Sequence, residues 1–167
     1  MLPHAMIRAR TCVRKIGALG GPIHARELST DRQINAVLGS RYPEVVEWVR
    51  RLVGEAPIAL HGTRDIIGVE VGGAISNVAS IAAGMAEALE LGGTARGVLL
   101  VHGLNDAKKI ALELGGSEKT FGGLAGLGEL IPRNVTSMDR HLELGAQIVS
   151  GASTEDALAR VGGHVEG

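Results

Sequence analysis

The 167-residue chain is long enough for one domain, or for one domain and part of another, and its 45% of hydrophobic residues can form a core. Its 17 Lys and Arg against 18 Asp and Glu leave a net charge of -1, so no overall field favours nucleic acid or an anionic membrane surface. The basic N-terminal residues are followed by no apolar stretch that could form a signal-peptide core or a membrane span. The single cysteine, Cys12, cannot form an internal disulfide, and we expect a reducing, cytoplasmic location.

Two features of the composition narrow the fold class. Aromatic residues make up only 2% of the chain, and 25 of its 167 residues are glycine. Small residues let helices approach closely, whereas strand-rich folds carry more aromatic and β-branched residues. We therefore expect a mainly α fold with tightly packed helices.

The first sixty residues predict short elements of α/β character. They are a strand at 16–19, a turn at 20–22, a strand at 34–38, a helix at 42–53 and a strand at 58–60. This is too little for an independent dinucleotide-binding fold, which needs a further βαβ unit. The segment instead resembles the tail of such a domain.

From Asp65 onward the apolar residues recur every three or four positions, which predicts one long helix that ends at Gly92–Gly93. Thr94 is expected to cap a second helix, which runs to Gly115–Gly116. Shorter helices are expected from about 121, over 137–150 and from 153, where Ser153 and Asp156 have the spacing of a capping box.

Polar residues form a stripe on the first long helix. Glu70, Gly73, Asn77 and Ser80 are spaced three, four and three apart, which places them on one side of an otherwise apolar helix. Buried polar groups need partners, and the spacing leaves two alternatives open: bonds to neighbouring helices, or a ligand site.

The segment 122–130 is rich in glycine, which is costly to order in a helix. Such a cost indicates either a tight helix crossing or the close approach of a ligand.

These segments resemble a known family, the NAD(P)-dependent glycerol-3-phosphate dehydrogenases. The segment 65–78 is similar to the family's D-x-x-G-x-E-x-x-G-A-x-K-N-V, 20–27 to its S-G-P-S-x-A-x-E, and 120–130 to its T-F-x-G-L-A-G-L-G-D-L. Further on, 139–141 falls on the family's S-R-N and 165–167 on its late V-E-G.

The resemblance implies a fold and a reaction. The fold would be the tail of a Rossmann-type α/β nucleotide-binding domain at 1–62, followed at 63–167 by an incomplete all-α substrate domain like that of 6-phosphogluconate dehydrogenase. The reaction would be reversible hydride transfer between NAD or NADP and a small phosphorylated triose or polyol, interconverting dihydroxyacetone phosphate and sn-glycerol 3-phosphate. A helical half rich in small residues would also allow a homodimer.

The resemblance also implies roles for single residues. Arg140 matches an arginine that binds phosphate and lines the cofactor, Gly21 a turn glycine against the substrate, and Asn77 the asparagine after the catalytic lysine. Ala25 and Glu166 match positions that line the cofactor. Asp139 and His141 flank the arginine, and together with Glu129, which stands where the family has Asp, they complete the predicted substrate-binding set.

The sequence departs from the family pattern at the catalytic position. Ser76 stands where the family has its lysine, the general acid and base, and a hydroxyl does not supply the proton and positive charge of an ammonium. His141 replaces Asn, and Asp139 replaces Ser and brings a carboxylate to the expected phosphate site. The alternative is a non-catalytic relative that binds a phosphorylated metabolite or a partner subunit.

Further motifs are missing. The G-x-G-x-x-G phosphate loop is absent, and the chain looks truncated at both ends, so we expect that it does not bind NAD(P)H measurably by itself. The six histidines lack metal-ligand spacing, and we propose no metal site. The single tryptophan, Trp48, gives no stacking platform for nucleic acid, and we exclude that class.

Overall fold

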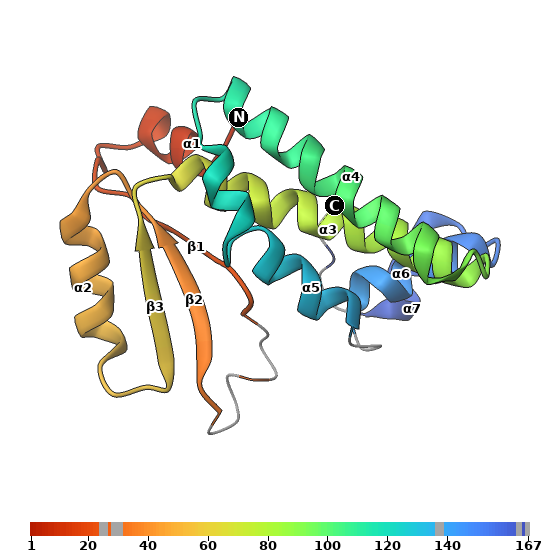
Figure 1. The fold of residues 1–167 in the computed structure, drawn as a ribbon. Helices are drawn as coiled ribbons and strands as arrows, with labels where there is room; N and C mark the ends of the chain where they lie inside the picture. Colours follow the sequence, from red (N-terminus) through yellow and green to blue (C-terminus); the bar gives the residue numbers. More distant parts are fainter. Residues whose placement is uncertain (24–26, 28–31, 136–138, 163–164, 166–167) are drawn as a thin grey trace. The chain divides into compact units, whose positions relative to one another are not determined.

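The structure is a computed structural model that describes residues 1–23, 27, 32–135, 139–162 and 165. A small sheet of three strands is followed along the chain by long helices, so the mainly α fold class predicted from the sequence is confirmed (Figure 1). The chain forms two compact units. The first contains Met1–Gly73 and Ala107–Glu129, and the second contains Ala74–Asp106 and Leu130–Gly167.

The sheet lies in the first unit and has the strand order β1-β2-β3. Strand β1 (Ala18–Gly20) pairs antiparallel with β2 (Ile34–Gly39), and β2 pairs parallel with β3 (Ile58–Thr63). Parallel strands need a crossover, and α2 (Pro43–Val53) supplies it.

Strand β2 is the central strand and is buried along almost its whole length. Helix α2 packs Val45 and Val46 against Leu38 of this strand. Burial on both faces explains why β2 carries three successive apolar residues, Ala36–Leu38, instead of alternating apolar and polar ones.

The elements predicted for the first sixty residues are confirmed, with shifted bounds. The first strand was expected at 16–19 and forms at Ala18–Gly20, and the third extends beyond 60 to Thr63. Helix α1 (Pro3–Arg10) was not predicted. It has no buried residue, so its sequence carries no apolar period that would reveal it.

Two long helices follow the sheet. Helix α3 (Ile66–Ala88) is the long helix predicted from the period of three and four, and α4 (Gly92–Glu113) is the second one. Both run through the two compact units, because each unit contains part of each helix. The sequence-based division at residue 62 stays a prediction, although β3 ends and α3 begins within a few residues of it.

The turn between the two helices differs from the prediction. Helix α3 ends at Ala88, and Glu90 adopts a left-handed conformation with φ of 53°. The N–H of Leu91 donates to Ala86 O, and that of Glu90 to Glu87 O, which is the hydrogen-bond pattern of a Schellman motif. The predicted end at Gly92–Gly93 and the predicted cap at Thr94 are therefore wrong, because these residues form the first turn of α4.

Helix α3 has the length and composition of a membrane-spanning helix, and it is the one among the described helices that does. It has 23 residues, and an 18-residue stretch of it has a mean hydropathy of 1.6. However, 61% of that stretch is buried inside the structure. The buried core helix of a protein has the same combination of length and composition.

The remaining helices are short. The region expected to be helical from 121 contains a 3-10 turn, η2 (Glu118–Gly122), and then α5 (Leu127–Val135). Helix α6 (Arg140–Val149) begins later than the expected 137, and 136–138 lie outside the described residues.

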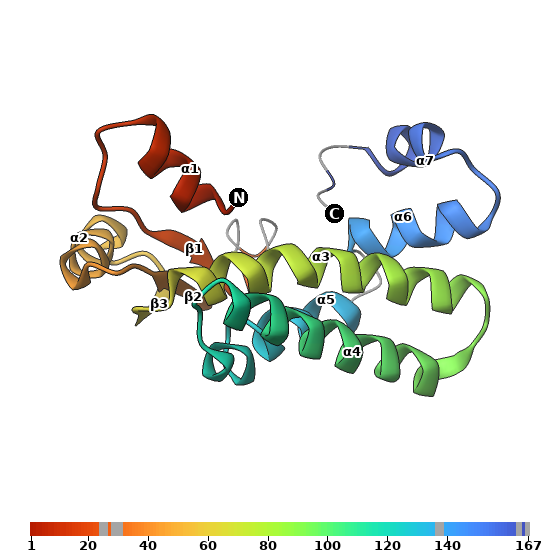
Figure 2. The ribbon, with the colours of Figure 1, turned by 90° about the horizontal axis from the view of Figure 1, so that it is seen from above.

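The second unit contains α6 and the last helix, α7 (Thr154–Val161), which pack against each other (Figure 2). Ser153 caps α7: its Oγ accepts the N–H of Asp156 at 3.1 Å and lies 2.7 Å from Asp156 Oδ2. The predicted start of this helix is confirmed.

Glycines allow close approach within each unit, as the composition predicted. In the first unit, a Cβ at Gly72 of α3 would overlap the carbonyl oxygen of Ala125. In the second unit, a Cβ at Gly84 would overlap that of Leu142, and one at Gly145 that of Ile81. Helices α3 and α6 therefore pack backbone to backbone at two glycines.

Candidate functional site

In the first unit, the structure brings together two predicted substrate-binding residues. The N–H of Gly21 donates to Glu129 Oε2 at 3.2 Å, across 108 positions of sequence. Glu129 is only 5% exposed. Gly21 follows β1 with φ of +88°, and a Cβ there would stand 3.2 Å from the backbone N of Val37. Glycine is therefore required at this turn.

Glu129 lies in the first turn of α5, at the end of the glycine-rich segment 122–130. A Cβ at Gly126 would overlap the backbone of Phe121, which is itself fully buried. Close packing therefore explains this glycine. The tight turn it permits is what carries the carboxylate of Glu129 toward the turn at Gly21.

The residues of the family motif at the start of α3 make hydrogen bonds and close contacts within the protein. Asp65 Oδ1 accepts the N–H of Gly68 at 2.9 Å, and Oδ2 accepts the N–H of Ser117 at 3.1 Å and the hydroxyl of Thr120 at 2.5 Å. A Cβ at Gly68 would overlap Asp65 Oδ2. Asp65 and Gly68 thus tie η2 to the start of α3.

Glu70, the first member of the polar stripe, holds helix α1. Its Oε1 accepts the backbone N–H of His4 at 2.8 Å, and its Oε2 lies 2.6 Å from His4 Nδ1. Both side chains are largely buried, at 8% and 12% exposed. A carboxylate in this position satisfies a free N–H at a helix N-terminus. This contact was not predicted, since no spacing connects positions 66 residues apart.

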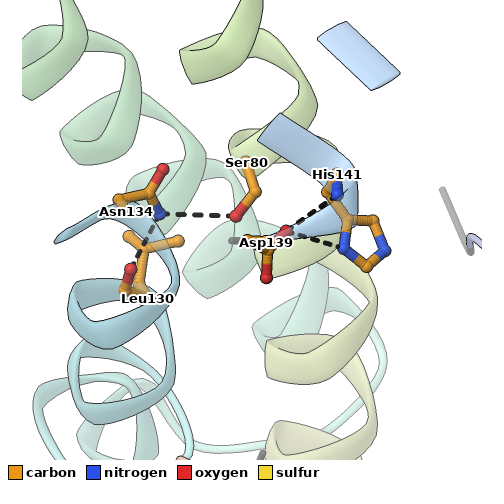
Figure 3. Close-up of polar contacts among 5 residues, drawn as sticks. All are labelled: Ser80, Leu130, Asn134, Asp139 and His141. Atoms are coloured by element: carbon orange, nitrogen blue, oxygen red, sulfur yellow. Dashed lines mark hydrogen bonds and ion pairs between the residues drawn. The ribbon is translucent and has the colours of Figure 1, made fainter. Parts of the chain in front are cut away.

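In the second unit, Ser80 of the stripe bonds to a neighbouring helix. Its Oγ accepts from the side-chain amide of Asn134 at 3.3 Å, and the same amide donates to Leu130 O at 2.7 Å (Figure 3). Of the two alternatives for the polar stripe, Glu70 and Ser80 thus follow the first, hydrogen bonds to neighbouring helices. Asn77 and Ser76 are also buried, at 5% and 4% exposed, and each makes a polar interaction.

The three predicted residues at 139–141 form the start of α6. Asp139 is its N-cap: Oδ1 accepts the backbone N–H of His141 at 2.8 Å and lies 3.0 Å from His141 Nδ1 (Figure 3). A short acidic side chain is favoured at this position. The carboxylate that looked unfavourable beside a phosphate thus stabilises the helix start.

Arg140 occupies the first position of α6 and is exposed. Within the described part of the chain, its guanidinium makes no hydrogen bond or ion pair. Its charge is therefore accessible to an anion from solvent.

Two predicted cofactor residues, Ala25 and Glu166, lie outside the described residues. Arg140 is thus the described member of that set, and an exposed guanidinium fits an anionic group such as the phosphates of a dinucleotide. Among the described residues, no group of three or more His, Cys, Asp or Glu side chains is arranged to hold a metal ion.

Comparison with known proteins gives a consistent result. The family model described as the NAD-dependent glycerol-3-phosphate dehydrogenase C-terminus matches residues 65–167. Glycerol-3-phosphate dehydrogenase (NAD(P)+) of Halothermothrix orenii is 33% identical over 99% of this chain and 49% of its own length. The protein of the same name from Cupriavidus taiwanensis is 36% identical over 100% of this chain and 51% of its own.

Solved structures agree with the sequence matches. Glycerol-3-phosphate dehydrogenase of Coxiella burnetii has a TM-score of 0.92 at 25% identity and covers 98% of this chain and 50% of that chain. The yeast enzyme, at 18% identity and a TM-score of 0.77, shares the fold. The chain spans about half the length of the curated relatives it matches. Since the family model covers the helical part of the chain and these relatives cover nearly all of it, the chain belongs to the NAD-dependent glycerol-3-phosphate dehydrogenase family.

Proposed function

We propose that the protein acts as an NAD(P)-dependent glycerol-3-phosphate dehydrogenase, which interconverts dihydroxyacetone phosphate and sn-glycerol 3-phosphate. The observation that carries this proposal is the match of the family's C-terminal domain to residues 65–167, together with relatives of that name along nearly the whole chain. The bound NAD or NADP would supply or accept the hydride. A cytoplasmic location and a homodimer, both expected from the sequence, belong to the same proposal.

The residues of this chain would bind and orient the substrate. Arg140 is an exposed guanidinium at the N-terminus of α6, where the helix dipole also favours an anion, and it can pair bidentately with phosphate. In the first unit, the family resemblance assigns substrate contacts to Glu129 and Gly21, which are hydrogen-bonded to each other. Asn77, buried on α3, would contribute its side-chain amide.

Removing Arg140 tests the phosphate assignment. We expect R140A, in the protein as its source cell makes it, to raise the KM for dihydroxyacetone phosphate by about 10- to 100-fold, since a charge-assisted hydrogen bond contributes about 1.5–3 kcal/mol. The measurement is NAD(P)H oxidation at varied substrate concentration. The control is R160A in α7, because Arg160 donates to Gln147 and is exposed. An unchanged KM in R140A contradicts the assignment.

One observation favours a second function. Ser76 stands at the position of the family lysine, and a buried hydroxyl carries no ammonium proton. A non-catalytic relative would bind a phosphorylated metabolite or a partner subunit through the helical part. Turnover of dihydroxyacetone phosphate with NADH or NADPH separates the two functions: its absence, with sn-glycerol 3-phosphate still bound in calorimetry, favours the binding protein.

A further inference from the structure

The start of α6 holds a carboxylate and an imidazole in direct contact. Asp139 Oδ1 lies 3.0 Å from His141 Nδ1, and the two side chains are only 8% and 12% exposed. The same oxygen accepts the backbone N–H of His141 at 2.8 Å, so the helix start itself fixes the position of the carboxylate.

This contact decides how the ring is oriented. An ionised carboxylate only accepts hydrogen bonds, so the Nδ1 atom that faces it carries a proton. Nε2 is then the ring nitrogen that does not face the carboxylate, and it is shielded from solvent. A carboxylate that orients an imidazole through Nδ1 is the arrangement that serves proton transfer in many hydrolases.

The packing of α6 places Leu142, the residue after this pair, against α3, the helix that carries Ser76. Leu142, next to His141, presses against Gly84, where a Cβ would overlap its carbonyl oxygen. Gly84, Ser80 and Ser76 are four residues apart on α3, so they follow one side of the helix at steps of about 6 Å. A lysine at position 76 would extend from this side of α3.

Resting on the proposed function, we infer that His141, oriented by Asp139, exchanges the proton with the substrate oxygen, in the place of the lysine that Ser76 replaces. In ketone reduction the bound nicotinamide would supply a hydride to the carbonyl carbon, and His141 would give the proton on Nε2 of its imidazolium to the carbonyl oxygen. The products are the alcohol, the oxidised coenzyme and a neutral imidazole, while Asp139 stays ionised. Oxidation of the alcohol reverses each transfer.

The surroundings of the ring suit this role. Asp139 Oδ1 contacts the ring at Nδ1, and the neutral side chains Ser80 of α3 and Asn134 of α5 are hydrogen-bonded to each other (Figure 3). On α6 itself, Arg140 is exposed and Glu143 lies in the first turn.

The first test measures turnover of the protein as its source cell makes it. We expect H141N to lower kcat by about 100-fold or more, the usual contribution of a positioned proton donor, with KM for dihydroxyacetone phosphate changed by less than about threefold. The fall of kcat/KM for ketone reduction with rising pH should disappear in H141N. Adding S76K to H141N should restore most of the rate, which a merely structural role of His141 does not explain.

Matched controls keep loss of folding apart from loss of the proton donor. H102N replaces an exposed histidine of α4 and should leave kcat and its pH dependence unchanged. D139S removes the carboxylate but keeps a side chain that can cap α6, and should lower kcat without changing the urea midpoint by much. If H141N keeps both the rate and the pH dependence, the inference is overturned.

A second measurement does not depend on turnover. The ring Cε1–H signal of His141, assigned in NMR spectra of the 167-residue chain by its loss in H141N, should shift when sn-glycerol 3-phosphate is added. Binding without a shift of this signal overturns the inference and leaves the proposed function standing. If the compound does not bind and the native protein does not turn over dihydroxyacetone phosphate, the proposed function fails and the inference fails with it.

Discussion

At the scale of single residues, the family motif at the start of α3 is mainly structural. Asp65 accepts three hydrogen bonds, from Gly68, Ser117 and Thr120, and Gly68 leaves the space that the carboxylate of Asp65 occupies. Glu70 accepts the backbone N–H of His4 in the first turn of α1. These residues therefore fix the chain around α3, whereas the residues proposed to meet the substrate follow later, from Asn77 onward, apart from Gly21 and its turn.

The glycines of α3 and α4 give a matched test of close packing. We expect G72A to lower the free energy of unfolding by about 3 kcal/mol, at the upper end of the usual cost of overpacking, because the obstructing atom belongs to the backbone of Ala125. G97A in α4 meets nothing within 4 Å and should raise it by about 0.5–1 kcal/mol through helix propensity. Urea unfolding measures both. Equal effects of the two substitutions contradict the packing argument.

At the scale of elements, α1 depends on one carboxylate. It contains no buried residue. Two contacts of His4 with Glu70 join it to α3, and Arg14 donates to Arg8 O at its C-terminal end. Helices of this length are marginal by themselves in water. We infer that α1 is folded because Glu70 accepts at its N-terminus.

Removing the charge of Glu70 tests this anchor. In E70Q we expect the amides of α1 from Ile7 onward to exchange with solvent about tenfold faster or more, since a hydrogen bond to a charged group contributes about 1.5–3 kcal/mol. Amide hydrogen exchange followed by NMR gives the rates. E47Q, which removes the exposed partner of Arg50 on α2, serves as the control and should leave α1 unchanged. Unaltered protection of α1 in E70Q argues against the anchor.

At the scale of the whole molecule, the long helices connect the two compact units, since α3 and α4 each contribute residues to both. The features that bind a nucleotide in a Rossmann-type domain are only partly present in this sequence. The sheet has three strands, and no G-x-G-x-x-G turn occurs in the sequence to bind a pyrophosphate at a helix N-terminus.

We therefore expect the 167-residue chain to bind NADH and NADPH too weakly for isothermal titration to detect. Glycerol-3-phosphate dehydrogenase (NAD(P)+) of Halothermothrix orenii, of which this chain covers 49%, is the positive control. Micromolar affinity of the 167-residue chain for either nucleotide contradicts the expectation, and a binding surface would then have to be sought around Arg140.

The sequence by itself determined the elements, because helices, strands and caps depend on contacts between near neighbours. The period of three and four predicted α3, the apolar run predicted β2, and Ser153 with Asp156 marked the start of α7. The end of α3 was missed, because Glu90 adopts a left-handed conformation that glycine usually takes.

Only the tertiary structure decided which residues meet. Glu129 and Gly21 are 108 positions apart, His4 and Glu70 are 66 apart, and no period links either pair. The contact of Asp139 with His141 lies close in sequence and had a signal, since an acidic residue before a helix is a common N-cap. No signal in the sequence predicted how α6 packs against α3. That packing depends on Gly84 and Gly145, where the backbones of the two helices touch.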